Sequence, residues 1–195
     1  MSYYQAPKGL TTKHIKIGTL RFRLFIPAAS IQDRIKELAK RIKSDYRGKN
    51  PIIICILKGG VIFASDLIRA SEVNGEMDFV RLSSYDGTAS TENVKELMSV
   101  SSEVKGRHVL IVEDIVDTGR TLDFYMDLLK KQEPLSIELA SLLLKPDALK
   151  YPIDIKYLGF KIPDLFVVGY GLDYNESGRS LRDIYQLDLP DVGMF

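Results

Sequence analysis

The stretch VLIVEDIVDTGRT, residues 109–121, decides the fold and places the chemistry. Its first four residues are apolar, a run typical of a strand that is buried on both faces of a parallel sheet. Two adjacent acids, Glu113 and Asp114, follow directly, and we interpret them as the end of that strand. A third acid, Asp117, comes three residues later, immediately before a helix that we expect over 118–131.

The start of this helix is a candidate phosphate site. In open α/β sheets, ligands bind beyond the carboxyl ends of the strands. A helix start also offers unpaired backbone N–H groups and the positive end of the helix dipole. A glycine in this turn lets the backbone approach a phosphate closely. The residues expected to hold the phosphate are Thr118, Gly119, Arg120 and Thr121.

The two adjacent acids have a different predicted use. Glu113 and Asp114 can accept hydrogen bonds from the hydroxyl groups of a sugar. A helix start with acids near its dipole would by itself explain Asp117 and Thr118. It would not explain two acids directly after four apolar residues, because losing water there is costly without partners. We therefore interpret the segment as a binding site.

Strands and helices alternate through the middle of the chain. The expected helices cover 30–46, 61–70 and 118–131, and the expected strands cover 51–57, 77–85, 94–101, 108–112 and 137–144. This alternation predicts an α/β fold with an open, mostly parallel sheet flanked by helices. At the start of the first helix, Ser30 followed by Asp33 resembles a capping box. Residues 86–93 are polar and are expected to form a loop.

The two ends of the chain follow another pattern. Residues 13–26 alternate apolar and polar side chains, and 154–162 and 165–174 read as strands without a helix between them. With 195 residues, we expect a single domain. Its core is expected to span about 30–150. A small antiparallel lobe, here called the hood, is expected from about 1–29 plus 151–195.

The composition limits the classes of partner. Hydrophobic residues make up 45% and charged residues 27%, as in ordinary globular proteins. The net charge of +1 predicts no nucleic-acid and no membrane partner. The single cysteine, Cys55, lies in an apolar run and is expected to be a buried thiol. The chain has no stretch typical of a signal peptide or a membrane span, so we expect a cytoplasmic enzyme.

Residues 109–121 resemble the signature with which type I phosphoribosyltransferases bind phosphoribosyl diphosphate (PRPP). Four further segments are similar, in the same order, to segments of the hypoxanthine-guanine phosphoribosyltransferases. They are the pyrophosphate loop at 57–60, the start of the mobile loop at 83–85, the strand with the base-reading lysine at 141–145, and the purine-binding segment at 162–176. A single Asp-Thr-Gly match would be weak, whereas five segments in the right order are specific.

The resemblance implies a reaction in purine salvage. A 5-phosphoribosyl group would pass from PRPP to hypoxanthine or guanine, giving IMP or GMP and pyrophosphate, with Mg²⁺ as cofactor. One alternative is a transferase for another base, against which Lys145 and the Phe166-Val167 segment argue. Another is a non-catalytic regulator that senses PRPP, against which Asp117 together with Lys145 argues. The family also suggests a homodimer or homotetramer.

The resemblance assigns roles at the purine. Asp117 would take or share the proton on purine N7, as a general base. Lys145 would donate to the oxygen at C6 of a 6-oxopurine base, although alone it would read as a surface lysine. Phe166 would stack on the base, and the backbone of Val167 would bind its edge. Without the resemblance, core packing would explain these two residues equally well.

The resemblance also assigns roles at the pyrophosphate. Asp173 would lie near the base and bind Mg²⁺ directly or through water, although alone it reads as an acid in a turn. Lys58, Gly59 and Arg179 would contact the pyrophosphate, and the peptide bond between Leu57 and Lys58 would be cis. Ser84 and Tyr85 would begin the mobile loop, and Asp86 and Glu92 are acids that depart from the family's loop.

Overall fold

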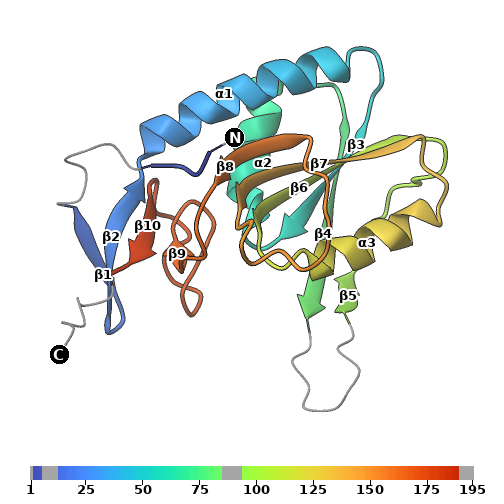
Figure 1. The fold of residues 1–195 in the computed structure, drawn as a ribbon. Helices are drawn as coiled ribbons and strands as arrows, with labels where there is room; N and C mark the ends of the chain where they lie inside the picture. Colours follow the sequence, from blue (N-terminus) through green and yellow to red (C-terminus); the bar gives the residue numbers. More distant parts are fainter. Residues whose placement is uncertain (1, 6–12, 85–93, 189–195) are drawn as a thin grey trace.

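The main sheet has the expected open, mostly parallel form. The computed structural model describes residues 2–5, 13–84 and 94–188. Within these residues, the main sheet has the strand order β5-β4-β3-β6-β7-β8 (Figure 1). The strands are β3 (Ile52–Leu57), β4 (Glu76–Ser84), β5 (Val94–Met98), β6 (His108–Val116), β7 (Ser136–Leu144) and β8 (Tyr157–Lys161). Neighbouring strands from β4 to β8 run parallel, and β5 returns antiparallel to β4.

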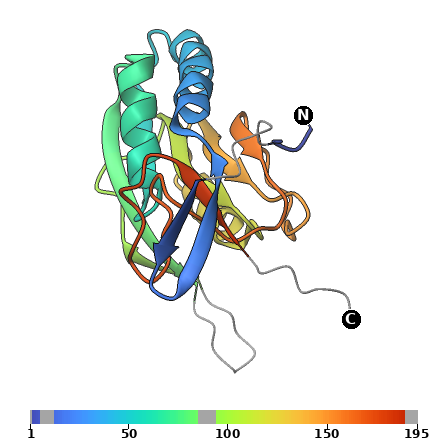
Figure 2. The same cartoon turned by 90° about the vertical axis from the view of Figure 1, so that its left-hand side faces the viewer.

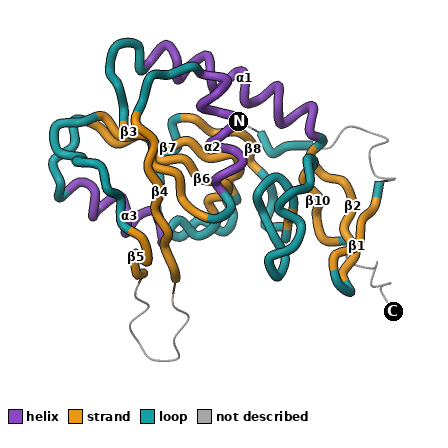
Figure 3. Tube along the Cα trace, turned by 180° about the vertical axis from the view of Figure 1, so that it is seen from behind, coloured by secondary structure: helices purple, strands orange, loops and turns teal. Residues whose placement is uncertain are grey.

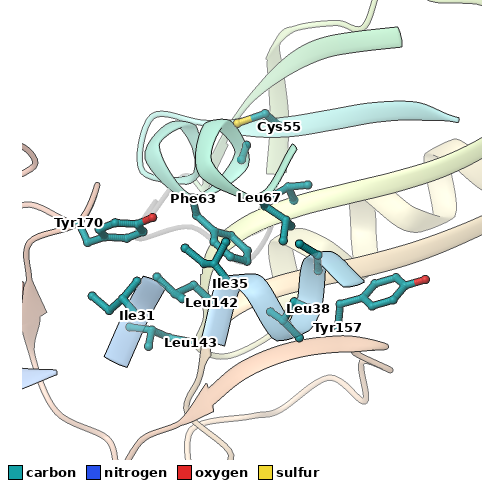
Figure 4. Packing of buried hydrophobic residues seen from close by; sticks show 14 of the residues in the cluster. Ile31, Ile35, Leu38, Cys55, Phe63, Leu67, Leu142, Leu143, Tyr157 and Tyr170 are labelled. Carbon is teal, nitrogen blue, oxygen red and sulfur yellow. The ribbon is translucent and has the colours of Figure 1, made fainter. Parts of the chain in front are cut away.

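Helices cover both faces of this sheet (Figures 1 and 2). Helices α1 (Ala28–Asp45) and α2 (Gly60–Ser71) share one apolar cluster with one face, and α3 (Arg120–Lys130) shares another with the opposite face. In the first cluster, Phe63 and Leu67 of α2 lie close to Ile35 and Leu38 of α1 (Figure 4). The thiol of Cys55 is buried beneath α2, as expected. Apolar packing on both faces thus fixes the strand ends that carry the site.

The predicted capping box at the start of α1 is wrong. The helix begins at Ala28, so Ser30 lies inside its first turn, and no side chain of the flanking Pro27 caps it. Instead, the carboxylate of Asp183 accepts a hydrogen bond of 2.8 Å from the backbone N–H of Ala28. An acid far along the chain supplies the cap, so no local pattern could have revealed it.

The hood is a second, antiparallel sheet with the order β1-β2-β10-β9 (Figure 3). Its strands are β1 (His14–Ile17), β2 (Leu20–Ile26), β9 (Val167–Val168) and β10 (Ile184–Leu187). Segments far apart in the chain meet in this lobe, because β2 pairs with β10. The described residues 2–5, which were expected to join the hood, lie instead at β8 of the main sheet, where the backbone N–H of Tyr4 donates to the carbonyl oxygen of Lys161. None of the helices in the described ranges is long and apolar enough to cross a membrane.

The expected boundary of the hood near residue 150 lies one strand too early. Strand β8 pairs in parallel with β7 and completes the edge of the main sheet. The segment between β7 and β8 contains no helix, so the usual strand–helix–strand signal is missing from the sequence. The C-terminal part of the hood therefore begins after β8.

Candidate active site

Strand β6 continues to Val116, beyond the two acids that were expected to end it. It keeps its pairing with β7 from Glu113, opposite Ser141, to Val116, opposite Leu144. Successive side chains of a strand point to opposite faces. Accordingly, Glu113 lines a cavity beside the start of α3, whereas the carboxylate of Asp114 lies against the start of α2. The two acids therefore flank the strand rather than form one pair beyond its end.

Burial disfavours the ionised forms of Glu113 and Asp114. It raises the pKa of Glu113 well above its usual range, and the charge of Asp114 adds to this effect. It also raises the pKa of Asp114 to about 6, although backbone N–H groups and Arg179 oppose that shift. Within the described residues, Oε2 of Glu113 is buried without a hydrogen-bond partner. A buried acceptor of this kind is suited to a ligand that brings hydroxyl groups.

The turn into α3 forms the wall of a cavity of about 250 Å³. Its lining comprises residues 56–57, Leu82, Glu113 and 115–122. Helix α3 begins at Arg120, two residues later than expected, after Gly119 with φ of +81°. A Cβ at Gly119 would lie 2.8 Å from the carbonyl oxygen of Tyr151, so a side chain does not fit there.

Hydrogen bonds from the loop at residues 150–151 orient the backbone of this turn. The carbonyl oxygen of Thr118 accepts hydrogen bonds from the backbone N–H groups of Lys150 and Tyr151, at 3.0 and 3.1 Å. In a trans peptide unit the C=O and the N–H point in opposite directions. The N–H of Gly119 therefore points away from that loop, which suits it for an anion in the cavity.

Three charged side chains stand in a row at the ends of β6, β7 and β8. Nζ of Lys145 lies 2.9 Å from Oδ2 of Asp117 and 3.1 Å from Oδ1 of Asp164. The lysine side chain is 10% exposed, whereas those of Asp117 and Asp164 are 49% and 63% exposed. Burial disfavours the charged form of Lys145, but the two carboxylates outweigh burial and raise its pKa. The row thus holds a protonated amine between two acceptors.

The expected pyrophosphate loop lies at the start of α2. The peptide bond between Leu57 and Lys58 is cis. A Cβ at Gly59 would lie 1.7 Å from Oδ2 of Asp114, so any larger residue would displace the carboxylate of Asp114. Gly171, with φ of +101°, packs as closely from the other side, because its Cβ would lie 2.1 Å from the carbonyl oxygen of Gly59.

A network of ion pairs covers this loop from the hood side. Arg179 Nη2 lies 2.6 Å from Oδ1 of Asp173 and 3.2 Å from Oε2 of Glu176. The other carboxylate oxygen of Glu176 lies 2.8 Å from Nζ of Lys58. Arg179 also donates to the carbonyl oxygen of Gly171. The structure therefore brings Lys58, Arg179 and Asp173 together, as expected, with Glu176 between the two cations.

An internal hydrogen bond anchors the segment that carries this network. The hydroxyl of Tyr170 donates to Asp66 of α2 at 2.5 Å, and Gln32 of α1 also donates to Asp66 at 2.8 Å. The Tyr170 ring is buried beside α1 and α2 (Figure 4). Burial and the Asp66 carboxylate raise the pKa of the Tyr170 phenol, so it stays a donor. The sequence did not indicate the pairing of Tyr170 with Asp66, because the pair joins distant segments.

The expected base-binding residues lie at the junction of the hood and the main sheet. Phe166 is 45% exposed, and its ring meets that of Tyr174 edge-on with 6.0 Å between centroids. Val167 is buried at the start of β9. Ser84 ends β4, and Tyr85 and the rest of the expected mobile loop lie outside the described residues. Within those residues, no group of three or more His, Cys, Asp or Glu could hold a metal ion alone.

Comparison with known proteins agrees with this geometry. The family model described as the phosphoribosyl transferase domain matches residues 27–175. A hypoxanthine-guanine phosphoribosyltransferase from Streptococcus pneumoniae is 43% identical over 160 residues, which are 82% of this chain and 89% of that protein. The chain belongs to the hypoxanthine-guanine phosphoribosyltransferase family. The resemblance drawn from the sequence is thereby confirmed.

Solved structures of hypoxanthine-guanine phosphoribosyltransferase relatives share the fold. A crystal structure of a hypoxanthine phosphoribosyltransferase from Staphylococcus aureus has a TM-score of 0.81 and 42% identity, covering 85% of this chain and 90% of that one. A bifunctional protein TilS/HprT from Listeria innocua is 42% identical over 160 residues. The matched region is 82% of this chain but only 25% of that longer relative.

Proposed function

We propose that this chain transfers the 5-phosphoribosyl group of PRPP to hypoxanthine or guanine, giving IMP or GMP and pyrophosphate. The observation that carries the proposal is the contact of 2.9 Å between Asp117 and Lys145 beside a helix start suited to phosphate. A 6-oxopurine carries an oxygen at C6 next to N7 on one edge. An ammonium donor beside a carboxylate acceptor complements that edge when N7 carries a proton.

The chemistry follows from where these groups lie. The bond between C1′ and the pyrophosphate oxygen breaks, C1′ gains oxocarbenium character, and N9 of the purine bonds to C1′. The proton on N7 passes to Asp117, while Lys145 donates a hydrogen bond to the oxygen at C6. Glu113 and Asp114 hold the ribose hydroxyls, and residues 118–121 hold the 5′-phosphate. Phe166 stacks on the base, whose edge meets the backbone of Val167.

The pyrophosphate would leave toward two cations that pair with Glu176. Lys58 and Arg179 supply positive charge there, and Gly59 lets the loop approach closely. Their present partner is the carboxylate of Glu176, so binding of PRPP requires an exchange of ion pairs.

Mg²⁺ is the proposed cofactor. The donor set fits, because Asp173 offers a carboxylate whose oxygens are held by Arg179 and by the backbone N–H of Glu176. One carboxylate with retained waters and substrate phosphates is a common way to bind Mg²⁺. When bound, the ion would neutralise charge on the pyrophosphate. We expect no turnover after exhaustive chelation and recovery with Mg²⁺ or Mn²⁺, and full activity in chelator would contradict the role of Asp173.

The proposed assembly is a homodimer or homotetramer. Met77 of β4 and Met98 of β5, two neighbouring strands at one edge of the main sheet, are 41% and 40% exposed. Exposed apolar side chains on a sheet edge favour association. Sedimentation velocity at several concentrations measures the assembly, and a monomer throughout would contradict it. The net charge of +1 supports a small-molecule substrate rather than nucleic acid or a membrane.

One assay separates the proposed function from its alternatives. Purified protein is mixed with PRPP, Mg²⁺ and each of hypoxanthine, guanine, xanthine or adenine, and nucleotide formation is followed by absorbance. We expect turnover of hypoxanthine or guanine and little or none of adenine. Comparable efficiency on adenine would indicate a transferase for another base. PRPP binding without turnover of any base would indicate a regulator.

A further inference from the structure

Asp164 contacts the same ammonium group as Asp117 but has no role in the reaction described above. Its carboxylate lies 3.1 Å from Nζ of Lys145 and follows β8, whereas Asp117 follows β6 on the other side of β7. We propose that Asp164 is a positioning residue for base recognition, which holds Lys145 so that its remaining N–H points at the oxygen of a 6-oxopurine. This inference rests on the proposed function and deepens it.

The backbone fixes the three members of the row relative to one another. The N–H of Lys145 donates to the carbonyl oxygen of Val116 at 2.9 Å, which ties the end of β7 to the end of β6. The N–H of Ile162 donates to the carbonyl oxygen of Leu144 at 2.9 Å, which ties the end of β8 to that of β7. The sheet therefore fixes the strand ends from which these side chains extend.

The hydrogen-bonding capacity of Lys145 leaves one donor for the base. An ammonium group has three N–H donors and no acceptor. Asp117 and Asp164 each take one, so the orientation of the third is determined by the other two. With Asp117 alone, the ammonium group could rotate about that single contact. The second carboxylate turns a flexible lysine into a directed donor.

Asp164 also remains a partner of Lys145 while Asp117 takes the purine proton. When Asp117 takes the purine proton, its carboxylate becomes neutral and holds Lys145 less strongly. Asp164 touches no purine nitrogen in this scheme and takes no proton from the base, so Lys145 keeps one carboxylate partner throughout. The raised pKa of Lys145, which both carboxylates support against burial, agrees with this arrangement. Because the side chain of Asp164 is 63% exposed, its pair with Lys145 adds little to fold stability.

The first test replaces Asp164 by Asn. Charge-assisted hydrogen bonds are the strong ones, but solvent weakens this one, so we expect kcat/KM for hypoxanthine to fall roughly 3- to 30-fold. The KM for PRPP should stay within about twofold, because the phosphate groups bind elsewhere. Asp164→Glu, which keeps the charge, should recover part of the loss. Asp127→Asn is the matched control, since it removes an exposed carboxylate that pairs with Lys130 on α3.

The second test asks whether Asp164 acts through Lys145. In a double-mutant cycle, Asp164→Asn should reduce activity in the wild-type background and have little further effect in a Lys145→Ala background. Equal losses in both backgrounds, or a loss equal to that of Asp127→Asn, would overturn the proposal. If the wild-type protein turns over hypoxanthine and Asp164→Asn matches it, the inference fails alone. If the wild-type protein turns over no 6-oxopurine, the proposed function itself fails.

Discussion

The two sheets of the molecule bring different kinds of group to the site. The main sheet presents Asp117 and Lys145 at the ends of strands that backbone hydrogen bonds hold in register. The hood side presents Asp173, Glu176 and Arg179, which contact one another through their side chains. Ordering costs less for groups already fixed by a sheet. We infer that the main sheet determines the chemistry, and that the hood side binds the pyrophosphate by exchanging ion pairs.

The largest expected effect tests the main sheet. Asp117→Asn keeps the shape of the side chain but removes the base and its charge, so Lys145 would retain only Asp164 as an ionic partner. General-base catalysis contributes typically ~10²–10⁴-fold, and kcat should fall by about that factor. The affinity for PRPP should change little. Steady-state kinetics with hypoxanthine and titration with PRPP measure the two quantities.

Two neighbouring substitutions provide the contrast for this prediction. Glu113→Gln and Asp114→Asn should weaken PRPP binding, because in the proposed reaction these acids would accept hydrogen bonds from ribose hydroxyls. They should reduce kcat less than Asp117→Asn does. A variant at Asp117 that loses PRPP affinity while kcat survives would show that the roles are assigned to the wrong acids.

A smaller effect is expected from pH. Burial raises the pKa of Asp114 to about 6, so its neutral form prevails below that pH. An acid with a raised pKa stabilises the fold at low pH and loses this contribution as pH rises through about 6. The ionised carboxylate is the stronger acceptor for a ribose hydroxyl, so PRPP binding should weaken below pH 6, by at most about tenfold per pH unit.

A comparison with Asp114→Asn separates the titration of the Asp114 carboxyl from the titration of PRPP itself. PRPP binding is measured by calorimetry at pH values from about 5 to 8, where a carboxyl group with a raised pKa changes charge. The same titrations are then made with Asp114→Asn. The variant should bind less tightly at neutral pH but show a flatter dependence below about 6. Parallel pH profiles for both proteins would exclude Asp114 as the titrating group.

The smallest expected effect tests the ion pairs of Glu176 with Lys58 and Arg179. Glu176 forms ion pairs with Lys58 and Arg179, and we propose that the pyrophosphate replaces it as their partner. Because Glu176 and Lys58 are largely exposed, the competing contact is weak, and Glu176→Gln should tighten PRPP binding only about two- to fivefold. Glu133→Gln, which removes an exposed partner of Lys105, serves as control. Weaker binding in Glu176→Gln would show that this acid supports the site directly.

The comparison of the two sheets also explains what the sequence could predict. Buried apolar runs and the acids after them identified β3, β6 and β7 and placed Asp117, because these signals are local. The rule that polar residues follow the ends of strands would also have singled out Asp164. It was missed because β8 was expected to belong to the hood. The second acid of the row therefore depended on a sheet assignment that the sequence pattern did not supply.

Contacts between distant segments could not be predicted in the same way. The pair of Tyr170 with Asp66, and the cap of α1 by Asp183, each join elements more than a hundred residues apart. The extension of β6 past Glu113 and Asp114 was also missed, because paired acids are poor candidates for a strand interior. The extension of β6 lies at the candidate site, where ligand-binding groups override local preference.

The central claim is that the row of Asp117, Lys145 and Asp164 at the strand ends selects a 6-oxopurine. Its most direct test is the ratio of kcat/KM for hypoxanthine to kcat/KM for adenine, measured for the wild-type protein and for Lys145→Ala. The wild-type protein should favour hypoxanthine strongly. Lys145→Ala should lose on the order of 10- to 1000-fold on hypoxanthine, because the oxygen at C6 is left unpaired, and should thereby lose most of the preference. Comparable efficiency of the wild-type protein on adenine, or an unchanged ratio in Lys145→Ala, would contradict the account.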